Sequence, residues 1–268
     1  MSTIKEDFIK ALLNSTSYAT FEDNKKPYFV DEYRNRVYYC MHLKSRELSR
    51  NRYGDYPFCA LASSARLAFI DYYNQYRDVS IFEIPLENGI PGSPTFMDVV
   101  VGDDYYECKC QEVLNRKVIK FRESYLKSKL FKEIVPGEYY KLDKEEAFFD
   151  LKALGINSVN ENKNFHFDIK QLVCHLIALA YCIERNTIVN NPTLKYIIYK
   201  PSKKEIEREQ NKTIQDMYSE LQSEVDAIWS SKIIQNFIQK RKINLIKPEE
   251  RFIDEIGIDF IYDKLNKK

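Results

Sequence analysis

Glycine and histidine are scarce in this chain. Seven glycines occur in 268 residues, and neither GxGxxG nor GxxxxGK(S/T) is present. The glycine-rich phosphate loops of dinucleotide-binding and P-loop proteins are therefore excluded. Three histidines argue against a histidine-rich metal site. No uncharged apolar run approaches the roughly 18 residues that a membrane-spanning helix needs, so we expect no membrane partner.

Charge of one sign and paired cysteines are also lacking. The formal net charge is +1, so any attraction to nucleic acid must come from a local basic surface. Six cysteines occur, none in a CxxC pair. Together with an N-terminal apolar run that contains charges, this favours reduced thiols and a cytoplasmic protein without a signal peptide.

The composition is that of a globular domain with a sizeable core, at 44% hydrophobic and 30% charged residues. The pattern predicts an N-terminal helical or irregular extension over 1–56 and a core over 57–200 with an insertion at 113–165. It predicts a C-terminal helical extension over 201–268, most of it one long amphipathic helix at 205–242.

The core reads as an α/β domain. Apolar spacing predicts helices, and β-branched and aromatic runs between turn residues predict strands. In chain order these are a helix at 57–76, strands at 79–86, 96–101 and 105–110, a helix at 166–184 and a strand at 194–200. The order αβββαβ predicts a mixed sheet flanked by helices.

Three charged residues occupy the two strands around Gly102, where ionised side chains are costly unless paired or bound to a metal. Residues i and i+2 of a strand share a face, so Glu107 and Lys109 are neighbours. A two-residue loop at Gly102-Asp103 places Asp98 opposite Glu107, whereas a loop at Asp103-Asp104 places it opposite Lys109. Both loops bring all three charges to one face.

Two carboxylates so close repel each other, and a divalent cation removes the conflict. Oxygen ligands suit Mg²⁺ or Mn²⁺, which activate water and polarise phosphoryl oxygens. Asp98 followed by Glu107-Cys108-Lys109, in αβββαβ order, resembles the PD-(D/E)XK nuclease superfamily, the restriction-endonuclease-like fold. The sequence contains other (D/E)xK triplets, but only this one follows a hairpin strand that carries an aspartate.

The resemblance implies a role for each residue of the motif. Asp98 and Glu107 would bind the metal with the backbone carbonyl of Cys108, and Lys109 would be the catalytic lysine. Gln171, in the Gln-Leu pair near the start of the second core helix, would be an accessory catalytic group. The helix at 57–76 shows no evident acidic residue facing the site.

Several neighbouring residues have two readings each. Glu83, on the strand before the hairpin, would be either a further metal ligand or a solvent-facing edge residue. Glu112 is interpreted as a surface salt bridge in preference to a second-metal ligand, and His175 as a satisfied boundary residue in preference to a catalyst. The basic run at 115–132 is either a phosphate-binding surface or a solvated face.

The leading hypothesis is a Mg²⁺- or Mn²⁺-dependent deoxyribonuclease, an endonuclease acting on double-stranded DNA in restriction or defence, with a homodimer left open. The alternative is a catalytically inactive nuclease-fold module that binds nucleic acid or protein. A third reading is a structural ion-pair cluster in an unrelated α/β domain.

Overall fold

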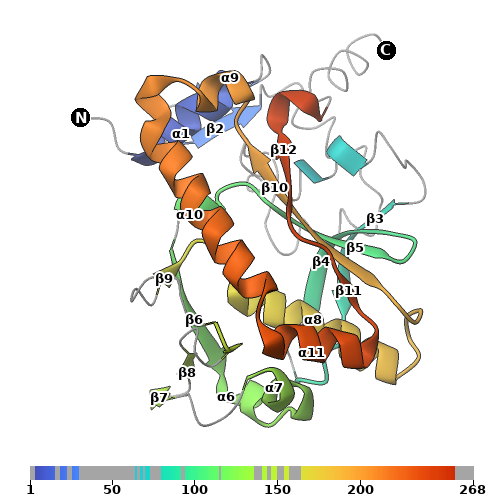
Figure 1. Ribbon diagram of the computed structural model, residues 1–268. Helices are drawn as coiled ribbons and strands as arrows, with labels where there is room; N and C mark the ends of the chain where they lie inside the picture. Colours follow the sequence, from blue (N-terminus) through green and yellow to red (C-terminus); the bar gives the residue numbers. More distant parts are fainter. Residues whose placement is uncertain are drawn as a thin grey trace.

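The protein is an α/β structure with a mixed sheet flanked by helices (Figure 1). A computed structural model describes residues 4–15, 19–22, 26–29, 64, 67–68, 70–72, 80–91, 94–114, 116–135, 141–143, 146–149, 154–156 and 164–256. No helix among these residues has both the length and the apolar character needed to cross a membrane.

The core sheet has the strand order β11-β10-β5-β4-β3, with β12 also paired to β10. Pairs β3–β4 and β4–β5 are antiparallel, whereas β10 runs parallel to β5, β11 and β12. The strands are β3 (Ser80–Leu86), β4 (Thr95–Val101), β5 (Asp104–Lys109), β10 (Thr193–Lys200), β11 (Asn244–Leu245) and β12 (Glu249–Phe252).

The β4–β5 hairpin fixes the register of the charged residues. Val101 pairs with Asp104, so the loop is Gly102-Asp103 and the alternative loop at Asp103-Asp104 is wrong. Gly102 has a φ of +59°, which glycine adopts without steric cost. Continuing this register places Asp98 opposite Glu107.

Helix α8 (Ile169–Glu184) connects β5 to the parallel strand β10 after the insertion. The sequence predicted one apolar face, yet every residue over 172–180 is buried. The reason is that α8 packs on the sheet with one side and on α7 (Lys129–Ile134) and α11 (Lys232–Arg241) with others (Figure 1). Within the range 57–76, residues 64, 67–68 and 70–72 are helical. The ring of Tyr72 packs at a tilt against the ring of Tyr106 on β5, with the two ring centroids 4.5 Å apart.

The insertion forms a second, four-stranded sheet of order β7-β8-β6-β9. Helices α6 and α7 follow β6, and Phe121, Tyr125 and Phe131 pack together between them. The elements of the insertion are η2 (Glu112–Leu114), β6 (Lys117–Arg122), α6 (Glu123–Leu126), α7, β7 (Lys141–Asp143), β8 (Glu146–Phe149) and β9 (Asn164–Phe165).

Two helices replace the single long helix expected at 205–242. Helix α10 (Lys212–Trp229) ends before Ser230, and the Ser231 side chain accepts the N–H of Ile234 to begin α11. Ser231 Oγ also donates to the carbonyl of Leu154, which fixes the break in the tertiary structure. The preceding elements are α9 (Lys203–Ile206) and η5 (Glu209–Asn211).

The expectation of a purely helical C-terminal part is wrong beyond α11, because β11 and β12 join the core sheet beside β10. The short helix η6 (Ile253–Glu255) follows β12. At the other end, α1 (Ile4–Leu13) buries Phe8 and Leu12 and contacts α10, and β1 (Ala19–Glu22) pairs with β2 (Lys26–Phe29). The N-terminal and C-terminal elements therefore pack together.

Candidate functional site

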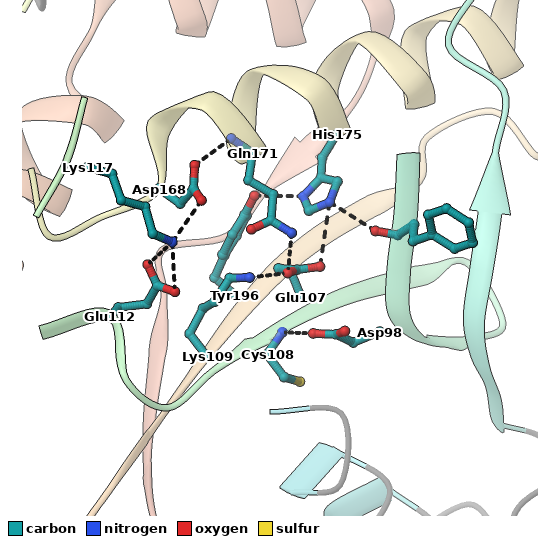
Figure 2. A network of polar contacts seen from close by, with 11 residues as sticks. Asp98, Glu107, Cys108, Lys109, Glu112, Lys117, Asp168, Gln171, His175 and Tyr196 are labelled. Atoms are coloured by element: carbon teal, nitrogen blue, oxygen red, sulfur yellow. Dashed lines mark hydrogen bonds and ion pairs between the residues drawn. The ribbon is translucent and has the colours of Figure 1, made fainter. Parts of the chain in front are cut away.

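Glu107 is the centre of a polar cluster between β5 and α8 (Figure 2). Its side chain is almost completely buried, at 3% exposure, and Lys109 from the same strand pairs with Oε1. Gln171, on the first turn of α8, donates from Nε2 to the same oxygen at 2.5 Å. His175, one turn further along, places Nε2 3.5 Å from Oε2. The sheet and the helix therefore meet at one carboxylate.

His175 is completely buried and held from both sides, so the expectation of a boundary position is wrong. Its Nδ1 lies 2.7 Å from the hydroxyl of Tyr196, and its Nε2 lies 3.1 Å from the carbonyl of Phe96. Burial and the charge of Lys109 lower the pKa of His175 to about 3, so the ring is neutral. Since the Phe96 carbonyl can only accept, we assign the proton to Nε2 and the Nδ1 lone pair to the Tyr196 hydroxyl.

Lys109 keeps its charge inside the protein. Burial by itself would lower its pKa, but the carboxylates of Glu107, Glu112 and Asp98 raise it above the ordinary lysine value. A charged ammonium therefore lies directly beside Glu107, as the hairpin pattern predicted.

Asp98 caps the end of the β4–β5 ladder. The paired residues end at Val99 and Tyr106, and beyond them Asp98 Oδ2 accepts the backbone N–H of Cys108 at 2.7 Å. The carboxylate takes a hydrogen bond that a neighbouring strand would otherwise supply. Asp98 is only half-buried, so it lies at the more open side of the cluster.

A second charge network fixes the start of α8. Lys117, on β6 of the insertion, pairs with Glu112 at 3.1 Å and with Asp168 at 2.8 Å. Asp168 is the N-cap of α8 and accepts the N–H of Gln171 at 2.9 Å. Burial by itself would raise the pKa of Asp168, but Lys117 and this capping bond lower it below its usual range. The expected salt bridge of Glu112 is present, although its side chain is largely buried.

A pocket of about 260 Å³ lies against the same two turns of α8. Gln171 and His175 line it and also contact Glu107. The start of β4 and the helix α6 supply Phe96 and Tyr125, and Lys170 adds a cation. A ligand bound in this pocket would therefore lie next to the carboxylate of Glu107.

The opposite face of the sheet carries a separate cluster that sequence reasoning missed. Asp71, a helical residue of the first core segment, accepts from the Tyr199 hydroxyl at 2.9 Å and pairs with Arg251 at 2.5 Å. Tyr199 also approaches the Cys108 thiol at 3.9 Å. Since Cys108 and Glu107 point to opposite faces, Asp71 serves β10 and β12 and does not face Glu107. The signal in the sequence was the alternation of side chains along β10, which places Tyr199 on the face opposite to Glu107.

In the described part of the chain, no three His, Cys, Asp or Glu side chains are grouped to hold an ion. The predicted set needs fewer: two carboxylates, from Asp98 and Glu107, and the Cys108 carbonyl. These are oxygen donors of the kind that Mg²⁺ and Mn²⁺ prefer, and the register places the two carboxylates opposite each other. The side chain of Glu83 lies outside the described residues, although its backbone is part of β3.

The basic run at 115–132 is divided between structural and exposed residues. Lys117 belongs to the network at α8, and Arg116 pairs with Glu220 of α10. Five others are exposed on β6, at the end of α6 and on α7: Lys120, Arg122, Lys127, Lys129 and Lys132. Of these, Lys127 lies 3.9 Å from the carboxylate of Glu123. Three of the cations that could neutralise phosphates, Arg116, Lys117 and Lys127, therefore already pair with carboxylates.

Comparison of the chain with protein-family models, curated proteins and solved structures gave no match. The functional interpretation therefore depends on the geometry of the Glu107 cluster.

Proposed function

We propose that this protein is a metal-dependent endonuclease that hydrolyses phosphodiester bonds in DNA, built on a restriction-endonuclease-like core. The observation that carries the proposal is the convergence on Glu107: Lys109 pairs with it along β5, and Gln171 donates to it from α8. Asp98 lies opposite in the hairpin register. The order β3-β4-β5-α8-β10, with β10 parallel to β5, supports this core.

Each residue has a distinct task in this proposal. Asp98 and Glu107, with the Cys108 carbonyl, would hold Mg²⁺ or Mn²⁺. The bound ion would lower the pKa of a coordinated water and polarise a phosphoryl oxygen. Lys109 stabilises negative charge that develops on the phosphate, because its ammonium is fixed beside Glu107. Gln171 orients the Glu107 carboxylate.

His175 is a positioning residue in the same proposal. Its neutral ring is held between Tyr196 and the Phe96 carbonyl, with Nε2 3.5 Å from the second oxygen of Glu107, so it occupies the space beside that oxygen without adding a positive charge. A proton at this ring is not needed for hydrolysis, since the bound ion would activate the water.

One observation favours the alternative, a nuclease-fold module that binds without cutting. Lys109 and Gln171 both occupy Oε1 of Glu107, and Asp98 is engaged with a backbone N–H. The same contacts would serve a structural ion pair. Measurements of metal binding and of DNA cleavage distinguish the nuclease from the binding module.

The decisive experiment incubates the purified protein with supercoiled plasmid in Mg²⁺, Mn²⁺ or EDTA. Wild type should nick and linearise the plasmid with either metal and not in EDTA. Lys109→Gln, which retains an N–H donor for Glu107, should lose cleavage by orders of magnitude.

Lys195→Gln is the matched control. Lys195 is a lysine on the neighbouring strand, paired with Asp104 at 2.5 Å and away from the cluster. This variant should cut like wild type. Absence of metal-dependent cleavage by a folded wild-type protein would overturn the proposed function in favour of the binding module.

A further inference from the structure

The pocket beside Gln171 and His175 differs from the carboxylate cluster in its chemistry. Gln171 supplies an amide, Thr95 a hydroxyl and Lys170 a cation, whereas Phe96 and Tyr125 are aromatic. A few polar groups among aromatic side chains are typical of a site for a ring-containing polar ligand. The carboxylate cluster, by contrast, suits a metal and a phosphate.

We infer that this pocket binds a single unpaired nucleotide of the substrate strand, next to the bond that is cut. The inference rests on the proposed function and names its substrate class: strands whose bases are single or can leave the helix. Gln171 and His175 make the connection, because both line the pocket and both contact Glu107. The nucleotide and the catalytic carboxylate are therefore neighbours across two side chains, whose contacts with Glu107 are drawn in Figure 2.

Lys170 gives the pocket its preference for an anion. Among the described residues, no carboxylate lies within ion-pair distance of Lys170, whereas the other charged lining residue, Asp168, pairs with Lys117. The half-buried ammonium of Lys170 is thus available to a phosphate group. Aromatic side chains and an amide then remain for the base, which enzymes that act on extruded nucleotides also read by stacking and hydrogen bonding.

The size of the pocket favours a single nucleotide over a stacked base pair. Its volume of about 260 Å³ lies just below the range typical of pockets for drug-sized ligands, so one nucleotide-sized group fills it. A base held in a duplex cannot enter without unpairing, which costs a few kcal/mol. Single strands and frayed or mismatched ends avoid that cost and are the preferred substrates.

Binding is tested in EDTA, so that no strand is cut. Thymidine monophosphate in millimolar excess should raise the melting temperature of wild type more than inorganic phosphate at the same concentration. Lys170→Gln removes a charge-assisted contact and should weaken nucleotide binding about tenfold or more. Lys204→Gln, an exposed lysine on α9, should bind like wild type.

Two outcomes overturn the inference. If wild type shows no shift with thymidine monophosphate, the pocket is not a nucleotide site. If inorganic phosphate gives an equal shift, Lys170 binds an anion only. Cys174→Trp provides a second variant. Cys174 lines the pocket, so the indole ring of the introduced tryptophan would fill the space and should abolish nucleotide binding. Loss of binding in Lys170→Gln keeps the test valid even if Cys174→Trp does not fold.

Cleavage separates this inference from the proposed function. With Mn²⁺, wild type should cut a single strand at least about tenfold faster than the same sequence closed into a duplex, in line with the unpairing cost. Lys109→Gln should bind thymidine monophosphate and cut nothing. If wild type binds the nucleotide but cuts no strand, the inferred nucleotide site stands and the proposed nuclease function is overturned. If wild type cuts duplex and single strand at equal rates, the inferred role of the pocket is overturned and the proposed nuclease function stands.

Discussion

The buried pair of Glu107 and Lys109 predicts a large and measurable coupling energy. Glu107 and Lys109 have side-chain exposures of 3% and 13%. Breaking a buried pair by removing one partner costs about 3–5 kcal/mol, because the other charge is left uncompensated. Lys109→Gln and Glu107→Gln should each therefore lose about this much free energy of unfolding.

The double variant carries no stranded charge and should be more stable than the sum of the single losses predicts. We expect a coupling energy of about 2–3 kcal/mol from the four-protein cycle. Urea unfolding followed by circular dichroism measures it. With a slope near 3 kcal/mol per molar urea, each single variant should shift the midpoint by about 1–1.7 M.

The pair of Lys203 and Glu207 is the control for this cycle. Its nitrogen and oxygen lie 3.8 Å apart at helical spacing, with side chains 72% and 64% exposed. Solvent screens such a pair, and its coupling energy should be about 0.3–0.5 kcal/mol. If the Glu107–Lys109 cycle gives no more than this surface pair, the buried ion pair does not exist in the folded protein and the reasoning is refuted.

Three further predictions follow from the described contacts. Asp98→Ala removes the acceptor of the Cys108 N–H, so calorimetry should show a loss of about 1–3 kcal/mol, whereas Asp98→Asn keeps an oxygen and should lose less but no longer gain stability from Mn²⁺. Ser231→Ala should lose about 1–2 kcal/mol in urea unfolding, because the N-cap of α11 disappears. Hydrogen bonds from Arg241 lower the pKa of Glu133, so this contribution to stability is complete above the ordinary glutamate pKa and is lost as pH falls through the lowered value. Arg241→Gln should flatten this acid-side loss of stability in urea unfolding at a series of pH values.

The sequence determined the local parts of the core. Alternating apolar residues and a glycine turn specified the β4–β5 hairpin, and helical periodicity specified α8. Because side chains alternate along a strand, Glu107 and Lys109 had to share a face, and an even loop had to add Asp98. Which even loop forms was decided by backbone geometry at Gly102, where φ is positive.

Tertiary structure decided what each charge contacts. Gln171, His175 and Tyr196 reach Glu107 or its neighbours only because α8 packs across β5 and β10, and no sequence spacing encodes that distance. From the sequence, Lys117 could be a phosphate-binding cation. In the folded protein its ammonium pairs with Asp168 instead.

The C-terminal part shows the same division. Its amphipathic pattern predicted helix, and helix formed at α10 and α11. The break at Ser231 depends on a hydrogen bond to Leu154, far away in the chain, and β12 became a strand because it pairs with β10. Periodicity is a property of neighbouring residues and can be read from the sequence. Pairing across a sheet and the partner of a buried charge depend on residues that only folding brings together.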